Sequence, residues 1–246
     1  SYPAKSLRVY MRDEYGDDEL DYPLFPGEEG QIFERFIIRN GSQQFHKTLL
    51  KDGVSHTLAK GIDNRRVDSM AFRSAILFVN GAFWGIHNLR ERLDDHYLSV
   101  RYDVDRDDIV IGELNGGIYD GQEGDEDLYW SLAAYINNED LSEPAHYAHV
   151  QTLMDTHNYI DYMAIEIFVQ NTDWPNNNYR YWRKRLDSYD PSAGVLDGRY
   201  RWFISDADTT WANPAFDALK RVLDPDELPD YAAWASSFFN GLLENP

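Results

Sequence analysis

The chain has no cysteine among its 246 residues. Disulfides, thiolate metal sites and cysteine nucleophiles are therefore excluded, but the compartment stays open because many secreted bacterial proteins also lack cysteine. Long apolar runs are missing too, since no stretch approaches the ~18 apolar residues of a membrane span. No basic segment leads into an apolar one either, so we expect neither a membrane span nor a retained signal peptide.

Basic residues are scarce: 23 Lys and Arg stand against 43 Asp and Glu, which gives a net charge of −20. This charge opposes broad contact with nucleic acid or anionic membranes, and no local basic patch offsets it. The hydrophobic fraction of 43% and the aromatic fraction of 15% are enough for a real core. The length suits one large domain or two modest ones.

The first part of the chain reads mainly as strands. A short strand is predicted from Leu7 to Met11, and "QIFERFIIRNGS" (31–42) predicts another that ends at the Asn40-Gly41 turn. Its inward residues are expected to be Phe33, Phe36 and Ile38. Two β-rich runs flank Asn80-Gly81, a dipeptide typical of a tight hairpin.

A helix is predicted between these strands, within "FHKTLLKDGVSHTLAKG" (45–61). Its apolar residues recur at helical spacing: Leu49, Leu50, Val54 and Leu58. Further on, "DDHYLSVRY" (94–102) predicts a short helix and "DIVIGEL" (108–114) a buried strand.

Helices then dominate the second part. Residues 128–136 and 147–154 are amphipathic, and "DTHNYIDYMAIEIFVQN" (155–171) predicts a longer helix. The apolar stripe of that helix is expected to be Ile160, Met163, Ala164, Ile167 and Phe168. Two alternating aromatic segments, 178–185 and 198–206, should pair as an antiparallel hairpin. Strands first and helices after indicate an α+β fold.

The segment "NTDWPNNNYRYW" (171–182) carries the strongest chemical signal. It places Asn178 five residues after Asp173, in a loop between an apolar helix and a strand. Protein kinases use a carboxylate and an amide at this spacing to orient the acceptor hydroxyl and to hold magnesium. They need a second metal carboxylate after the next hairpin, where "SDAD" supplies Asp206 and Asp208. Read alone, the segment is more typical of a helix-ending turn than of an active site.

The sequence resembles the spore coat protein H (CotH) kinase family over most of its length. The resemblance rests on "FVNGAFWGIHNLRERLDDHYL" (78–98), Gly124-Asp125, "YIDYMAIEIFVQNTDWPNNNYRYWR" (159–183) and "RWFISDAD" (201–208). It implies an atypical protein-kinase-like fold, with a strand-rich N-terminal lobe (1–93) and a mainly helical C-terminal lobe (94–246) that carries the catalytic loop. The apolar pattern "SSFFNGLLENP" reaches the last residue, so we expect that lobe to be truncated.

Particular roles follow from the resemblance. It implies that Asp173 is the catalytic aspartate, that Asn178 and Asp206 are metal ligands, and that Asp208 is a second metal carboxylate. It further implies ATP as co-substrate, Mg²⁺ or Mn²⁺ as cofactor, and Ser or Thr of secreted or surface proteins as acceptor. Adenine would be held by backbone groups near Glu91. From the acidic surface we expect a basic, Ser/Thr-rich protein substrate. The resemblance implies an extracellular location or one on the cell or spore surface.

Two departures from ordinary kinases are visible. No G-x-G-x-x-G loop precedes the second strand, and no V-A-I-K-like strand supplies a lysine for the phosphates. If "ERFIIRN" is the equivalent strand, Arg39, Lys47 or Lys51 would have to meet the phosphates.

Two other functions stay open at this point. A pseudokinase or structural surface module would keep the fold without catalysis, and the missing strand lysine favours it. A carbohydrate-active protein would use Asp173 and Asp206 as acid and base, beside a stacking platform of Tyr181, Trp182, Tyr200 and Trp202. Paired-strand aromatics are more often core, however, and His87 is expected to be a packed side chain.

Overall fold

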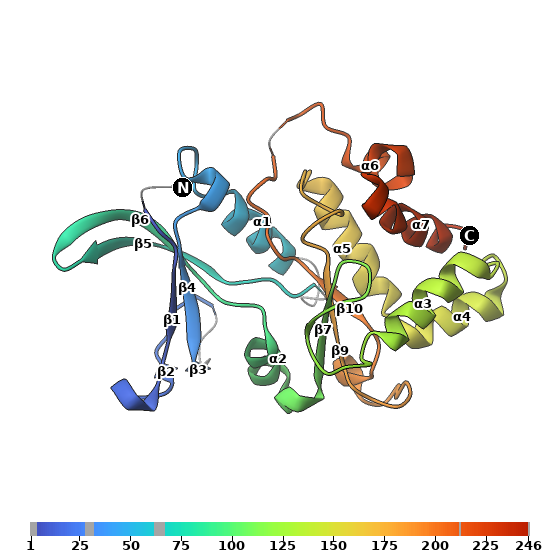
Figure 1. Ribbon diagram of the computed structural model, residues 1–246, viewed down its shortest axis with the longest axis horizontal. Helices are drawn as coiled ribbons and strands as arrows, with labels where there is room; N and C mark the ends of the chain where they lie inside the picture. Colours follow the sequence, from blue (N-terminus) through green and yellow to red (C-terminus); the bar gives the residue numbers. More distant parts are fainter. Residues whose placement is uncertain (1–3, 28–31, 62–66, 212, 246) are drawn as a thin grey trace.

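The computed structural model describes residues 4–27, 32–61, 67–211 and 213–245. It shows a mixed α/β protein with antiparallel sheets, which agrees with the predicted α+β class. One sheet lies at one end of the molecule and most helices at the other, with α1, α2 and a second sheet between them (Figure 1).

The first sheet has the strand order β1-β4-β6-β5, and all its pairs are antiparallel. Its strands are β1 (Leu7–Tyr10), β4 (Arg35–Arg39), β5 (Phe72–Val79) and β6 (Ala82–Arg90). Asn80 and Gly81 both have positive φ, 50° and 80°, as a two-residue hairpin turn requires. The predicted hairpin is therefore confirmed.

The single strand predicted over 31–42 is two strands in the structure. The short β3 (Ile32–Phe33) pairs with β2 (Leu20–Asp21) in a separate two-stranded sheet, and β4 joins the first sheet. Phe33 is buried as expected, whereas Phe36 and Ile38 are half-buried.

The second sheet has the order β10-β9-β7-β8 and is also antiparallel. Its strands are β7 (Ile109–Glu113), β8 (Gly117–Asp120), β9 (Arg180–Lys184) and β10 (Arg201–Phe203). The predicted pairing of the two aromatic segments is confirmed, because β9 and β10 lie side by side with Tyr181 opposite Trp202.

Seven α-helices lie in the described segments. They are α1 (Lys51–Lys60), α2 (Asp95–Tyr102), α3 (Asp127–Asn138), α4 (Pro144–Leu153), α5 (Thr156–Phe168), α6 (Ala218–Leu223) and α7 (Ala233–Leu242). Short 3-10 turns lie between the helices and strands. They are η1 (Asp13–Tyr15), η2 (Ser42–Gln44), η4 (Arg106–Asp108), η5 (Gly194–Leu196), η6 (Pro225–Glu227) and η7 (Asp230–Ala232). Within these segments, every helix is too short or too polar to traverse a bilayer.

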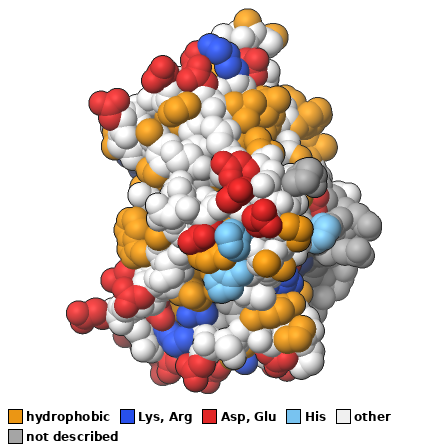
Figure 2. Space-filling view, turned by 90° about the vertical axis from the view of Figure 1, so that its right-hand side faces the viewer, with side chains coloured by type: hydrophobic (Ala, Val, Ile, Leu, Met, Phe, Trp, Pro, Cys, Tyr) orange, Lys and Arg blue, Asp and Glu red, His pale blue; other side chains and the backbone are white. Residues whose placement is uncertain are grey.

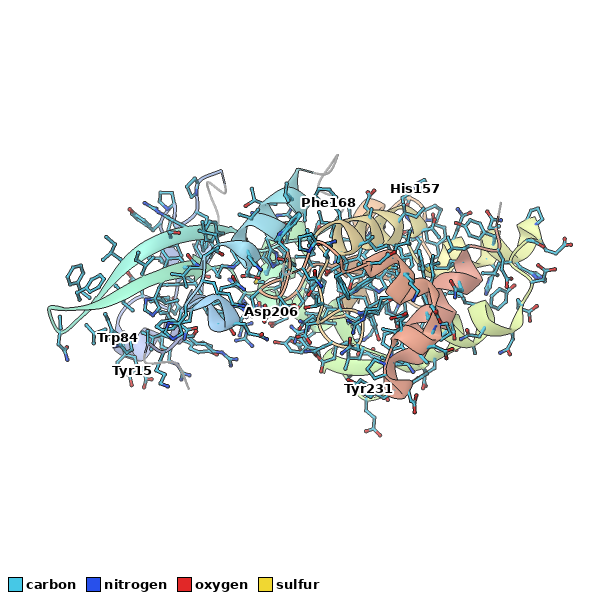
Figure 3. All side chains as sticks on the ribbon, turned by 90° about the horizontal axis from the view of Figure 1, so that it is seen from above. Tyr15, Trp84, His157, Phe168, Asp206 and Tyr231 are labelled. Carbon is cyan, nitrogen blue, oxygen red and sulfur yellow. The ribbon has the colours of Figure 1, made fainter. Side chains whose placement is uncertain are left out.

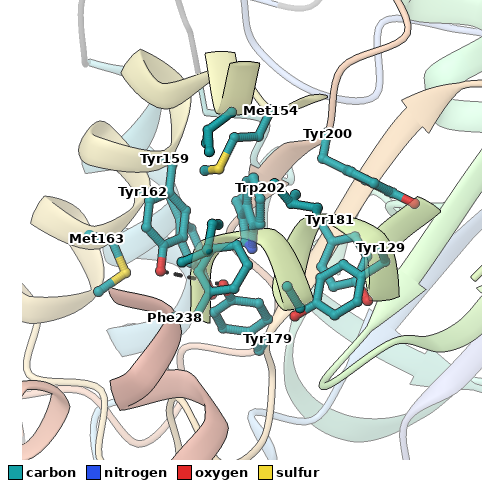
Figure 4. Close-up of a cluster of buried hydrophobic side chains, with 14 of the residues drawn as sticks. Tyr129, Met154, Tyr159, Tyr162, Met163, Tyr179, Tyr181, Tyr200, Trp202 and Phe238 are labelled. Carbon is teal, nitrogen blue, oxygen red and sulfur yellow. Dashed lines mark hydrogen bonds between the residues drawn. The ribbon is translucent and has the colours of Figure 1, made fainter. Parts of the chain in front are cut away.

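An aromatic core joins the second sheet to the helices (Figure 4). Tyr181, Trp182, Tyr200 and Trp202 are all at most 2% exposed. The stacking-platform interpretation is therefore wrong, and the core interpretation is right. Gly112 in β7 makes room for this core, because a Cβ there would lie 2.1 Å from the Tyr181 ring.

The apolar stripe predicted for α1 faces outward. Leu50, Val54 and Leu58 are 45%, 43% and 40% exposed. The buried face carries Asp52, Gly53, Ser55, His56 and Ala59. The predicted helix is confirmed, but its apolar residues are not its buried face. α1 meets the rest of the protein through ion pairs and hydrogen bonds, for which Asp52 and His56 supply the groups.

The stripe predicted for α5 is likewise mostly wrong. Ile160 and Phe168 are 58% and 63% exposed, and of the five expected residues only Met163 is buried. The inner face uses Tyr159, Tyr162, Met163, Ile165 and Glu166 instead. Two neighbouring faces of α5 are apolar, and the face with the larger aromatic rings is the one that joins the core.

Candidate active site

A cleft of about 270 Å³ lies between the two sheets. Its apolar lining comes from Ile37, Met70, Leu93 and the ring of Tyr119. Its polar lining includes four arginines, Arg8, Arg39, Arg92 and Arg180, and a single carboxylate, that of Asp206. Three of these arginines are paired with carboxylates: Arg39 with Asp206 and Asp208, Arg92 with Asp94, and Arg180 with Glu113. The excess of arginine over carboxylate is therefore a property of the immediate lining of the cleft. Asp206 lies between the strand-rich and helix-rich parts (Figure 3).

The loop 171–179 connects α5 to β9 and is fixed by a buried tryptophan. Trp174 is 1% exposed, and its Nε1 donates to the Tyr162 hydroxyl at 2.8 Å. Beyond it, Asn178 adopts the left-handed conformation with φ 57°. The turn interpretation and the site interpretation of this segment are thus compatible, because the turn is what orients its polar side chains.

Asp173 and Asn178 are directly bonded. The Nδ2 of Asn178 donates to Asp173 Oδ2 at 3.2 Å, and Asn177 Nδ2 donates to the same oxygen at 3.1 Å. Among the described residues, neither Asp173 Oδ1 nor Asn178 Oδ1 has a hydrogen-bond partner. Because Asn178 also lines the cleft, its amide offers an oxygen to a cation there.

Asn171 holds the two loops of the site together. Its side chain is fully buried, and its Nδ2 donates to the backbone oxygen of Asp206 at 3.1 Å and to Glu166 Oε2 at 3.0 Å. Its Oδ1 accepts from the Thr209 hydroxyl at 2.8 Å and from the Asp173 amide at 3.3 Å. The loop of Asp173 and the loop of Asp206 are therefore positioned by one amide side chain.

The two carboxylates of "SDAD" have different surroundings. The Asp206 side chain is 37% exposed and lines the cleft, whereas that of Asp208 is 5% exposed. Asp208 Oδ2 accepts from the Gln43 amide at 3.3 Å, and its backbone oxygen accepts from Gln44 Nε2 at 2.8 Å. Asp208 thus ties this loop to η2, and its role as a metal ligand stays a prediction.

Arg39 bridges both carboxylates from the end of β4. Its Nη2 lies 2.7 Å from Asp206 Oδ1 and 3.0 Å from Asp208 Oδ2. Burial alone would lower the pKa of Arg39, but Asp52, Asp206 and Asp208 raise it above its ordinary value. Burial raises the pKa of Asp206 despite Arg39. Of the other two residues predicted to meet the phosphates, Lys47 is exposed, and Lys51 is half-buried near Asp208. Neither lines the cleft.

Arg39 also belongs to a buried network of charged side chains, to which α1 contributes Asp52. Asp52 Oδ2 lies 3.7 Å from Arg39 Nη1 and 3.2 Å from Arg90 Nη2. Arg90, His56 and Arg39 hold the pKa of Asp52 below its usual range against the opposing effect of burial. His56 is fully buried, accepts from the Met70 amide at Nδ1 and contacts the Ser205 oxygen through Nε2 at 2.8 Å, which requires the neutral Nε2-H form.

Glu91 occupies the segment that follows β6, but its side chain points away from the cleft. Oε2 accepts from the Ala71 amide and lies 3.9 Å from Lys60 Nζ. The next two residues, Arg92 and Leu93, line the cleft. The structure therefore places Asn178, Asp206 and Arg39 in one cleft, whereas Asp173 and Glu91 are not among its lining residues. Asp173 is connected to the cleft through its hydrogen bond with Asn178.

Sequence reasoning missed four residues of this region: Asp52, His56, Arg90 and Asn171. Asp52 and His56 are spaced i,i+4 in α1, a pattern that marks one helix face but not the face that is buried. Asn171 stood in the quoted segment without an assigned role.

The described residues contain no group of three His, Cys, Asp or Glu side chains arranged to hold a metal. Magnesium in nucleotide sites typically uses one or two protein carboxylates together with phosphates and water. Asn178 and Asp206 both line the cleft, and their side chains carry hard oxygen donors of this kind. The residues present therefore fit a divalent cation that arrives with a nucleotide.

Comparison with known proteins identifies the family of the chain. No curated protein matches the chain. The family model described as "CotH kinase protein" matches residues 1–246, which is the whole chain. The resemblance seen in the sequence is thereby confirmed, and it points to a kinase-like phosphotransferase at the level of the family. The chain belongs to the CotH kinase protein family.

Proposed function

We propose that this chain is a protein kinase that transfers the γ-phosphate of ATP to Ser or Thr of a protein. The observation that carries the proposal is the cleft in which Asn178 and Asp206 face four arginines. A polyanion with a bound cation is the ligand that matches this lining, because the arginines attract phosphates and the two oxygens attract the cation.

The kinase-like division into lobes is part of the proposal. Residues 1–93 would form the N-terminal lobe around the first sheet, and residues 94–246 the C-terminal lobe around the second sheet and the helices. Arg92 and Leu93, at the junction, line the cleft between the sheets. In ordinary kinases the nucleotide lies at this junction, with its adenine near the hinge.

The apolar and the basic lining residues of the cleft suit different parts of a nucleotide. Ile37, Met70 and Leu93 provide the apolar surface that a base needs. Arg8 and Arg180 provide charge for phosphates, and Arg180 is held over the Tyr119 ring at 3.8 Å from its centroid. Together they would orient the triphosphate without a lysine.

Asp173 would orient the acceptor hydroxyl through Oδ1, the oxygen that its neighbours leave open. Asn178 and Asp206 would hold Mg²⁺ or Mn²⁺. The metal would neutralise phosphate charge during transfer. Arg39, which bridges Asp206 and Asp208, would supply fixed positive charge beside the metal-binding carboxylate. Its pairing with Asp52 of α1 parallels the strand-lysine and helix-glutamate pair of protein kinases.

The protein substrate is proposed from charge alone. Acidic side chains are spread over the helical end of the molecule (Figure 2), in keeping with the net charge of −20. A basic, Ser/Thr-rich segment complements this surface and would be steered toward it. We place such substrates outside the cell or on a cell or spore surface.

The test is transfer of labelled phosphate from ATP, with Mg²⁺ or Mn²⁺, to a basic Ser-rich protein. Asp173→Asn and Asp206→Asn should each lower the rate by at least about 100-fold, since each removes a group that acts at the reacting phosphate. Asp187→Asn, an exposed carboxylate in the β9–β10 loop, is the matched control and should leave the rate unchanged. Equal rates in all four proteins would refute the proposal.

One observation favours a second candidate, a pseudokinase that binds nucleotide without transfer. Arg39 already occupies the carboxylates of Asp206 and Asp208, as a cation would. In that case ATP should raise the melting temperature of the protein without any labelled product. A carbohydrate-active function loses its support, because its proposed aromatic platform is buried.

A further inference from the structure

The β5–β6 hairpin carries an apolar surface that nothing in the proposed function uses. Cross-strand pairing sets Ile76 opposite Ile86 and Phe78 opposite Phe83. These four side chains are 66%, 52%, 60% and 64% exposed, respectively, and the two Phe rings meet edge to face with centroids 5.9 Å apart. We call this set the arm face. The hairpin extends away from the rest of the molecule (Figures 1 and 3).

The arm is uncharged over an unusual length. From Ser74 to Asn88 there is no Asp, Glu, Lys or Arg, although 27% of the chain is charged. Exposed strands at a sheet edge are normally protected by charges or proline, and β5 is an edge strand without either in this span. A large exposed apolar patch on an otherwise acidic protein is typical of an interaction surface.

The area of the arm face determines how strong a complex it can form. Val79 and Trp84 lie on the opposite face of the hairpin, because Val79 directly follows Phe78 and Trp84 stacks on His87. The four residues of the arm face offer roughly 500 Å² of surface, so a symmetric pair would bury about 1,000 Å², at the lower limit of specific protein interfaces. Such an area suits a reversible association in the micromolar range. Two sheets can pack face to face about 10 Å apart and bury these side chains against one another.

The absence of charge on the arm indicates which kind of partner could bind it. A basic or acidic partner needs opposite charge on the arm, which has none. An anionic membrane would repel a chain of net charge −20 that has no lysine or arginine on the arm. A second copy brings an equally neutral arm. The hairpin strands are about 26 Å long, several times the roughly 8 Å Debye length at physiological salt, so the acidic bodies of two copies stay screened from each other.

We propose that two copies of this chain associate through their β5–β6 arms, with the arm faces packed against each other about a two-fold axis. The symmetry is self-complementary, so that Phe78 and Phe83 of one copy meet the same residues of the other. The association leaves the cleft open, because no residue of the arm face lines it. It is independent of whether the protein transfers phosphate.

Sedimentation equilibrium of the full chain over about 1 to 200 μM tests this proposal across the micromolar affinity range expected for so small an interface. The wild type should pass from monomer to dimer, and Phe83→Glu should remain a monomer at every concentration. Tyr231→Glu, at an aromatic residue 71% exposed in η7, is the matched control and should dimerise like the wild type. Because both residues point into solvent, circular dichroism should show all three proteins equally folded.

A mixing experiment makes the test specific. Phe83→Glu and Phe83→Lys should each be monomeric alone and form a mixed dimer together, since the two new charges then face each other. A wild type that stays monomeric, or a Phe83→Glu variant that dimerises as strongly as the wild type, would overturn the proposal. So would flotation of a monomeric wild type with neutral phosphatidylcholine vesicles, which would assign the arm to a membrane.

Discussion

The two sheets that border the cleft are held in different ways. The second sheet, β10-β9-β7-β8, lies on an aromatic core in which Tyr181, Trp182 and Trp202 are almost completely buried. The first sheet, β1-β4-β6-β5, meets α1 and the "SDAD" loop mainly through charges, centred on Asp52, Arg39 and Arg90. The wall that carries Asp173 and Asn178 is therefore fixed by packing, and the opposite wall by ion pairs.

This difference has physical consequences. Packing of buried rings is insensitive to pH, whereas buried ion pairs depend on the ionisation of each partner. A buried pair also stabilises a fold only when all its members are present, because a lone buried charge is costly. We expect the two walls to respond differently to the same kind of substitution.

The largest effect should come from Trp202→Ala on the packed wall. Trp202 contacts the rings of Tyr159 and Phe238, and its removal leaves a cavity where no side chain can collapse easily. The free energy of unfolding should fall by about 3–5 kcal/mol, with little dependence on pH. Urea denaturation at pH 6 and pH 8 measures both quantities, and a loss below about 1 kcal/mol would mean that this core is loosely packed.

Asp52→Asn should have a similar or slightly smaller effect on the charged wall. The amide cannot balance the guanidinium groups of Arg39 and Arg90, which stay buried. A loss of about 2–4 kcal/mol is expected, with an additional loss of nucleotide binding because Arg39 is no longer held in place. Calorimetric unfolding measures the loss of stability, and titration with a fluorescent ATP analogue measures the loss of nucleotide binding. Normal stability with normal binding would show that the network is dispensable.

A pH-dependent effect is expected from Glu166→Gln, beneath the two loops. Burial raises the pKa of Glu166 to about 8, while the unfolded chain releases that proton near 4.5. The stability that this carboxyl contributes is complete below pH 4.5 and declines until pH 8, by up to about 1.4 kcal/mol per pH unit. Glutamine keeps an oxygen that can accept the hydrogen bond from Asn171 Nδ2, and its side chain does not titrate.

The Glu166→Gln variant should therefore gain stability relative to the wild type as pH rises from 5 to 8. Thermal unfolding in a pH series gives this difference directly. The matched control is Glu123→Gln, at an exposed carboxylate in the loop between β8 and α3, and its curve should run parallel to that of the wild type. Parallel curves for Glu166→Gln and the wild type would show that Glu166 titrates as in the unfolded chain.

The smallest effect should follow Leu58→Ser in α1. Leu58 belongs to the apolar residues at helical spacing that predicted this helix, but its side chain is 40% exposed. A change within about 0.5 kcal/mol is expected, in contrast to the loss for Asp52→Asn in the same helix. Chemical denaturation of the two variants side by side would confirm which face of α1 is buried.

The sequence predicted local features well. The Asn80-Gly81 hairpin needs only two residues with positive φ, and the β9–β10 pair needs only alternating aromatics and a loop. The spacing of Asp173 and Asn178 was also a sufficient guide to their proximity. A turn of this length brings the two side chains within hydrogen-bond distance.

Features that depend on tertiary contacts were not predictable in the same way. Helical spacing shows which residues of α1 and α5 share a face, but both helices have apolar residues on more than one face. Which face is buried depends on partners far along the chain, such as Arg90 for Asp52 and Asp206 for Arg39. The role of Asn171 also required the positions of Glu166 and Asp206 to be known.

The central claim is that Asp173, Asn178 and Asp206 serve one nucleotide and metal site. Its most direct test is electron paramagnetic resonance of Mn²⁺ in the presence of a non-hydrolysable ATP analogue. Wild-type protein and Asp173→Asn should bind the ion with the nucleotide, whereas Asn178→Ala and Asp206→Asn should lose at least about tenfold in affinity for it. Unchanged Mn²⁺ binding in Asn178→Ala and Asp206→Asn would contradict the account.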